Sequence, residues 1–199
     1  MSLMRRRDLL QRSASALLAA SLAKAGPAAH AAPGSASGQG VELQRLALQR
    51  TDEGALLSYD VRIDLPDDLE QALGKGIAVV FVAEAELFRE RWYWTDESRA
   101  RAVRRWRLAY QPLTRAWRLS QEGLSRNCNS LTEALDSIRR TERWRIADLA
   151  ATSDDGDYHV DFSFRLDTHE LPRPLQIGLG GPFDWKLEAE RRVALPASR

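Results

Sequence analysis

Alternation of apolar and polar residues is the clearest pattern near the start of the chain. Positions 41–48 alternate with one slip in phase, and positions 55–65 alternate without interruption after the turn sequence 51–54. A period of two is typical of a β-strand that buries one face. We therefore predict a β-hairpin with one solvent-exposed face. The buried face of its second strand carries Leu57, Tyr59, Val61, Ile63 and Leu65.

Residues 66–94 predict a short helix and then a long strand. Pro66 and two aspartates open the helix, its apolar positions recur at helical spacing, and Gly74 and Gly76 end it. The unbroken apolar run 77–83 predicts a central strand buried on both faces. Alternation resumes from Glu84 to Trp94, so we expect this strand to continue toward an edge of the sheet through a bulge.

The rest of the chain predicts further hairpins and one more helix. A turn at 112–114 separates two alternating segments, the first with Trp106 and Leu108 on one face. The sequence Ser-Leu-Thr-Glu at 130–133 is a capping box, which predicts a helix through Arg140. Shorter strands are predicted near 144–146, 158–166, 175–179 and 185–193. Without βαβ alternation, these elements predict a mainly β fold, an antiparallel sandwich or barrel of about eight strands with two short helices.

Residues 1–31 have the pattern of a signal peptide rather than of a folded element. A basic start precedes a weakly apolar run at 13–23, and Ala29-His30-Ala31 fits a cleavage site after Ala31. The pair Arg6-Arg7 resembles a twin-arginine export motif, and ordinary secretion remains open as the route. Residues 32–40 have the composition of a flexible linker, which leaves a single domain at 41–195. We expect a periplasmic or secreted protein without a transmembrane segment in the mature chain.

Composition narrows the chemistry of the chain. Lys and Arg total 29 against 28 Asp and Glu, so a nucleic-acid partner is not expected. The single cysteine, Cys128, excludes an intrachain disulfide. His159 and His169 are too few for a metal site of three or four converging ligands, and no nucleophile elbow is present. We expect a non-enzymatic protein without a cofactor. A hydrolase that uses Cys128 or His159 is a less favoured hypothesis, ranked after the two given below.

Arginines concentrate in the middle of the chain. Seven occur at positions 99–118, and no acidic residue lies between Glu97 and Glu122. In the predicted hairpin, Arg105 and Arg107 share the face opposite Trp106. Such a patch can bind an anionic partner. The other interpretation is a solvated face whose arginines form ion pairs with acids on the neighbouring strand. Those acids would be Glu84, Glu86 and Glu90.

Three stretches carry a resemblance to a known group: 91–94, 105–115 and 166–176. Over residues 41–195 they make the chain similar to a family of exported bacterial proteins described as domain-of-unknown-function family 4390. The resemblance implies an accessory role in the envelope beside a nitrogen-regulation-type sensor kinase. It implies no activity and no catalytic residues.

Two functional hypotheses follow. The first is an interaction domain that binds an envelope protein or an anionic membrane surface through the arginine-rich hairpin and nearby aromatic residues. Its candidate binding residues are Arg105, Arg107, Arg115, Arg118, Trp92, Trp94 and Trp106. The alternative is a carrier or sensor that binds a small apolar or lipid-like ligand between its sheets. That cavity would be lined by the same three tryptophans.

Overall fold

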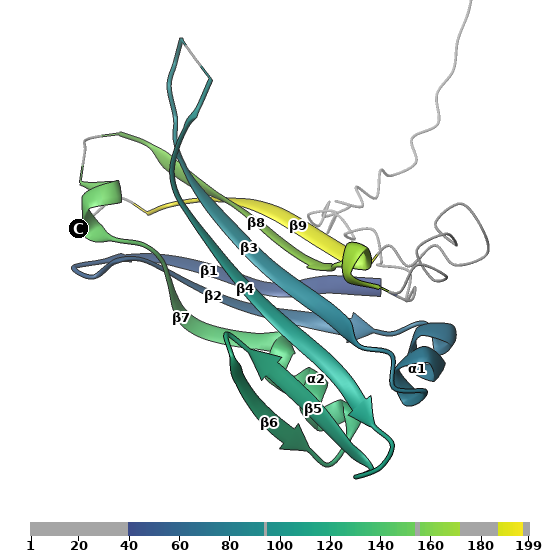
Figure 1. Ribbon diagram of the computed structural model, residues 1–199. Helices are drawn as coiled ribbons and strands as arrows, with labels where there is room; N and C mark the ends of the chain where they lie inside the picture. The colour runs from purple at the N-terminus through teal and green to yellow at the C-terminus, as the bar shows by residue number, and fades with distance from the viewer. Residues whose placement is uncertain (1–39, 94, 154–155, 172–186, 197–199) are drawn as a thin grey trace, which may run out of the picture. The chain divides into compact units, whose positions relative to one another are not determined.

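The computed structural model describes residues 40–93, 95–153, 156–171 and 187–196. These lie in one compact unit that comprises residues 37–199. The described part contains nine strands, which form two antiparallel sheets with the orders β1-β2-β7 and β6-β5-β4-β3-β8-β9 (Figure 1). The strands are β1 (Gly40–Thr51), β2 (Gly54–Asp64), β3 (Val79–Arg89), β4 (Glu97–Gln111), β5 (Ala116–Gln121), β6 (Leu124–Cys128), β7 (Arg140–Ala147), β8 (Tyr158–Leu166) and β9 (Glu188–Ala194).

The two sheets stack as the layers of an open sandwich, which confirms the predicted mainly β class. β1 contacts β9 at one side, and β7 contacts β3 and β4. Apolar residues from both inner faces form a single core. A series of aromatic rings crosses it, since Tyr59 of β2 lies 5.0 Å from Phe162 and 6.1 Å from Phe164, measured between ring centroids. Alternating side chains on each strand therefore supply the core from both layers.

The predicted first hairpin is confirmed, including its phase slip. β1 and β2 are antiparallel, with Thr51 opposite Gly54 at the turn. The register shifts between Leu43 and Arg45, so one extra residue on β1 forms a bulge there. The predicted inward positions 57, 59, 61 and 63 of β2 are all buried.

β3 is the central strand that its apolar run predicts, but it does not run toward an edge. It lies between β4 and β8 along its whole length, with Arg89 still opposite both Glu97 and Tyr158. The expectation of an edge was wrong because β4 begins at Glu97, well before the predicted hairpin strand, and so covers the second half of β3. The register shifts between Leu87 and Phe88, but the extra residue there is Arg99 on β4, so the bulge is on the partner strand and not on β3 as expected.

Two helices cap the sandwich, and both were expected from the sequence. α1 (Asp67–Gly74) buries Leu69, Ala72 and Leu73. α2 (Leu131–Arg139) begins after the N-cap Ser130, as the capping box predicts, and contacts β2, β5 and β6. Short 3-10 helices follow at Leu149–Thr152 and Thr168–Glu170. Among the described residues, no helix has the length and apolar character needed to cross a bilayer.

Other strands differ from the prediction in detail. β6 was not expected, because its five residues alternate weakly and four of them are exposed. β9 begins at Glu188, three residues later than the predicted strand. The strand predicted at 175–179, the signal peptide and residues 32–39 of the predicted linker lie outside the described residues. Gly40, the last residue of that predicted linker, is instead the first residue of β1.

Candidate functional site

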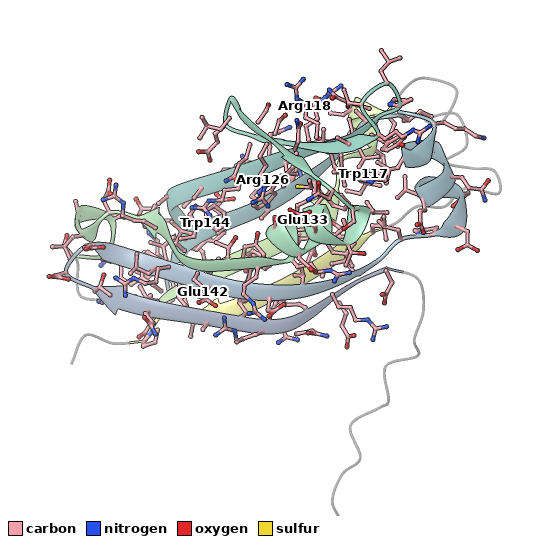
Figure 2. The ribbon with its side chains drawn as sticks, turned by 90° about the horizontal axis from the view of Figure 1, so that it is seen from below. Trp117, Arg118, Arg126, Glu133, Glu142 and Trp144 are labelled. Atoms are coloured by element: carbon pink, nitrogen blue, oxygen red, sulfur yellow. The ribbon has the colours of Figure 1, made fainter. Side chains whose placement is uncertain are left out.

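The outer face of the β4–β5 hairpin carries the arginines that the sequence singled out. Arg105 and Arg107 are exposed, whereas the alternate residues Trp106 and Leu108 are 2% and 0% exposed and face the core. On β5, Arg118 is exposed between two inward residues, and Figure 2 shows it on the outer side of this sheet. We call Arg105, Arg107 and Arg118 the arginine face.

Strand register brings two members of the arginine face together. Arg107 lies opposite Ser120, and Arg118 lies opposite Ala109. Arg107 and Arg118 are therefore diagonal neighbours on one face, within reach of long side chains in an antiparallel pair. Neither forms an ion pair with a described residue, and the same holds for Arg115. Two like charges thus lie side by side, and neither is in an ion pair with a described acid.

Arg101 pairs with an acid on the neighbouring strand, as the solvated-face interpretation predicts, and Arg105 of the arginine face is also paired. Glu84 on β3 pairs with Arg101 at 2.6 Å and with Arg165 at 3.4 Å. Arg105 lies 3.4 Å from Asp167, an acid that the sequence analysis did not consider. Ion pairing therefore accounts for Arg101 and Arg105. It does not account for Arg107 and Arg118, the other two members of the arginine face.

The β8–β9 side of the same face is internally neutralised. Arg192 donates two hydrogen bonds to Asp161, at 2.7 and 2.8 Å. These hydrogen bonds hold the pKa of the Asp161 carboxyl below its usual range, against the opposing effect of its partial burial. Unlike the arginine face, this end of the sheet carries charges that already have close partners.

A hollow of about 280 Å³ opens on the outer surface beside the arginine face. Arg105, Arg107 and Ser120 line it together with the buried Val80. Acidic residues of the β5–β6 turn and of the second 3-10 helix also contribute to its wall. The hollow offers space for an anionic group between guanidinium donors, which bind carboxylate or phosphate in a planar geometry.

Two other arginines of the cluster lie elsewhere. Arg104 is on the inner side of β4, with its guanidinium 5.1 Å from the centre of the Trp144 ring on β7. It contributes a cation–π contact between the sheets. Arg115 lies in the β4–β5 turn with a φ of 51°. The predicted binding residue Arg115 is therefore at the end of the hairpin rather than on the arginine face.

The structure does not bring the predicted tryptophans together. Trp106 is buried, and its Nε1 donates to Gln121 at 2.9 Å. Trp92 is 93% exposed beyond the end of β3. Phe81, opposite Trp106, is eight residues before the end of β3, so about 26 Å of strand separates the two positions. Trp94 and the cleavage residue Ala31 lie outside the described residues.

Trp106 instead forms part of a groove of about 470 Å³ between the β5–β6 hairpin and α2. Leu119 and Trp106 are its buried apolar side, and Leu124 is 79% exposed at it. Arg126 also lines the groove, on the side of the sheet that faces α2 in Figure 2. The sequence analysis missed Leu124 and Arg126 because it did not predict β6. The only signal for that strand was that Leu124, Arg126 and Cys128 occupy every second position.

Cys128 and His159 occupy separate places in the fold. Cys128 is 2% exposed at the end of β6, and His159 is 2% exposed on β8. Four strand spacings of about 4.8 Å separate β6 from β8, or about 19 Å in all. The two residues are too far apart to share one site. Within the described ranges, no group of three His, Cys, Asp or Glu side chains is placed to hold a metal ion.

Comparison with known proteins adds one finding. No curated protein and no solved structure matches the chain significantly. A family model described as "Domain of unknown function (DUF4390)" matches residues 38–194, a range that includes every described strand and helix. The chain therefore belongs to the DUF4390 family.

Proposed function

We propose that the protein is an exported, non-enzymatic interaction domain that binds an acidic partner in the bacterial envelope through its arginine face. The observation that carries the proposal is the adjacency of Arg107 and Arg118 on an exposed face, without an ion pair to any described residue. The signal-peptide pattern supports export. The resemblance to exported proteins with an accessory role beside a sensor kinase supports an envelope partner.

The physical argument concerns the cost of placing like charges together. Two neighbouring guanidinium groups repel each other, and the repulsion is removed when an anion binds between them. Residues 32–199 hold 24 basic and 27 acidic residues, so the positive region is a local feature of a net acidic chain. A carboxylate or phosphate at the hollow beside Arg105 and Arg107 can accept hydrogen bonds from Arg107, which forms no ion pair with a described residue.

The first prediction tests this function with the triple variant R105Q/R107Q/R118Q. A photo-cross-linking residue at Ser120 of the full chain, which is opposite Arg107, marks the bound partner in the native envelope. Loss of three contacts worth about 0.5 kcal/mol each should lower binding about tenfold. The free energy of unfolding should change by less than about 1 kcal/mol, because the three side chains are exposed.

A matched control removes the same charge from the other sheet. R45Q/R62Q/R145Q changes three exposed arginines of β1, β2 and β7 and should leave the cross-linked product intact. Added salt should weaken the wild-type interaction, since exposed charges are screened within about 8–10 Å. Equal cross-linking by both triple variants, or a triple variant that melts several degrees lower and still binds, would contradict the proposal.

A second candidate function is the binding of a small amphipathic ligand, and the groove beside α2 supports it. The groove has a volume typical of small-molecule sites and combines buried apolar walls with Arg126 at its side. Titration with a fluorescent fatty acid tests it, with Leu124→Asp as the variant that places a carboxylate in the groove. Saturable binding that this variant abolishes would support the carrier hypothesis, and an absence of binding would eliminate it.

A further inference from the structure

The connection between β3 and β4 ends in two exposed aromatic side chains. Residues 90–93 and 95–96 extend past the neighbouring strands at one end of the six-stranded sheet (Figure 1). Trp92 is 93% exposed and Tyr93 is 64% exposed, and their rings meet edge to face with centroids 4.6 Å apart. We call this pair the aromatic tip. A large apolar surface of this kind on a soluble domain usually marks an interaction site.

The base of the tip is held in place by the sheet. β3 and β4 stay paired up to Arg89 and Glu97, the last residues before the connection. Nδ1 of His159 lies 3.1 Å from a carboxylate oxygen of Glu90. The His159 ring is buried and stacks on Phe88 with 5.4 Å between centroids. The two rings of the tip are therefore presented from a rigid support, which lowers the entropy cost of binding.

Three acidic residues lie close to the tip. Of the carboxylates near the tip, Glu97 pairs with Arg91, and Asp96 accepts a hydrogen bond from the Arg91 backbone N–H at 3.3 Å. Glu90 contacts His159, as described above. Each of the three acids thus has a partner within this end of the sheet. Trp92 and Tyr93 themselves are uncharged.

The shape of the tip selects among possible partners. A stable protein interface buries about 800 Å² on each side, whereas two aromatic side chains supply about 300–500 Å². A narrow convex tip fits a medium that deforms around it. Trp and Tyr concentrate at the interface of bilayers, where the ring is buried and the N–H or O–H stays hydrated.

We propose that the aromatic tip inserts Trp92 and Tyr93 into the headgroup region of a phospholipid bilayer. The site is distinct from the arginine face, because Arg105 lies opposite Val82, seven residues and about 23 Å of strand before the end of β3. The inference does not depend on the proposed function. It adds a membrane contact at one end of the domain to the acidic partner proposed for its outer face.

Flotation of the full chain with phosphatidylcholine vesicles tests the proposal. W92S/Y93S should lower the vesicle-bound to free ratio at least about tenfold, since each ring contributes apolar area to the interface. The control Leu113→Ser removes a fully exposed apolar side chain from the β4–β5 turn and should leave the ratio unchanged. Wild-type binding should persist in high salt, because burial of aromatic area is not screened.

The apolar segment at residues 13–23 is present in every variant, so a difference between variants reports on the tip. Flotation of W92S/Y93S equal to that of the wild type would overturn the proposal, and so would a wild type that does not float. R105Q/R107Q/R118Q should float normally. Loss of its envelope cross-link therefore tests the proposed function, whereas loss of flotation by W92S/Y93S tests the membrane contact.

Discussion

Tyr59 shows how far burial alone changes a single side chain. Its ring is 0% exposed between Phe162 and Phe164. Its hydroxyl has no hydrogen bond of standard geometry to a described residue. Burial raises the pKa of Tyr59 to about 12, although nearby Thr141 and Arg104 act in the opposite direction. The folded state therefore holds this phenol neutral at pH values where the unfolded chain ionises.

We predict that Tyr59→Phe removes an alkaline loss of stability. Between pH 10 and 12 the unfolded state releases the Tyr59 proton and the folded state retains it, so the free energy of unfolding falls as pH rises. In this window the free energy of unfolding falls by about 1.4 kcal/mol for each unit of pH. Denaturant unfolding at pH 8 and pH 11 should show a decrease about 1.4 kcal/mol larger for the wild type than for the variant. Equal decreases would mean that the phenol ionises in the folded protein.

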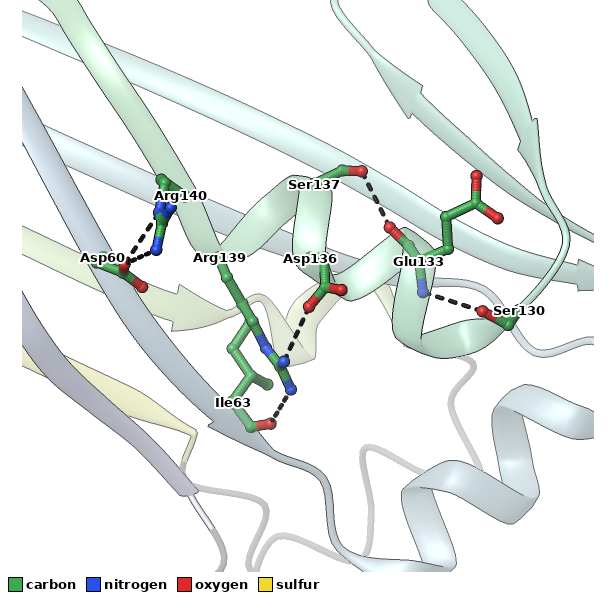
Figure 3. Close-up of polar contacts among 8 residues, drawn as sticks. All are labelled: Asp60, Ile63, Ser130, Glu133, Asp136, Ser137, Arg139 and Arg140. Atoms are coloured by element: carbon green, nitrogen blue, oxygen red, sulfur yellow. Dashed lines mark hydrogen bonds and ion pairs between the residues drawn. The ribbon is translucent and has the colours of Figure 1, made fainter.

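At the scale of elements, α2 connects the two sheets through its ends. At its start, Ser130 Oγ accepts a hydrogen bond from the Glu133 backbone N–H at 3.1 Å (Figure 3). At its end, Arg139 donates to the Ile63 carbonyl on β2 at 3.1 Å. Arg140 then donates to Asp60 at 2.7 Å. The helix therefore forms one wall of the groove at Trp106 while its last turn is attached to the other sheet.

The cap of α2 gives an element-scale prediction. Ser130→Ala leaves the Glu133 N–H without its acceptor and should lower the free energy of unfolding by about 1 kcal/mol. Ser137→Ala is the control, because Ser137 Oγ donates to the Glu133 carbonyl one turn earlier and is not required by the helix. Denaturant midpoints measure both variants, and equal losses of stability would contradict a capping role for Ser130.

Gly54 in the β1–β2 turn gives a second prediction at the scale of elements. Gly54 has a φ of +116°, and a Cβ there would lie 2.1 Å from the Ala147 carbonyl oxygen on β7. Gly54→Ala should cost more than about 3 kcal/mol, since backbone strain adds to a collision with main chain. Gly74→Ala, at the end of α1 where a Cβ meets nothing within 4 Å, should stabilise by up to about 1 kcal/mol. A mild effect at Gly54, measured by thermal unfolding, would show that β7 shifts to make room.

At the scale of the whole molecule, the predicted signal peptide gives a prediction about the mature chain. We predict cleavage after Ala31, because Ala29 and Ala31 fit the small-residue pattern and Pro33 disfavours cleavage one residue later. Intact-mass analysis of protein from the native host should find residues 32–199. A full-length chain recovered from the cytoplasm would contradict the prediction. Replacement of Arg6 and Arg7 by Lys should abolish export only if the twin-arginine route is used.

Elements with strong local signals were predictable from the sequence. The hairpin of β1 and β2, the helix caps and the β3 core run depend on alternation, capping residues and apolar length, which are properties of neighbouring residues. β6 and the first half of β4 were missed for the same reason. No residue in the first half of β4 is buried, and four of the five residues of β6 are exposed. Their strand structure depends on pairing with β3 and β5 rather than on a pattern of their own.

The sequence by itself determined the class of fold and the side of β4 on which Arg105 and Arg107 lie, because strand alternation is a local constraint. Only the tertiary structure decided which charges are paired. Glu84 meets Arg101 through strand register, and Arg105 meets Asp167 from a segment 62 residues away. Arg107 forms no ion pair with a described acid. The same register placed Trp106 in the core and Trp92 at the tip, since proximity between distant residues depends on how strands pair and not on their composition.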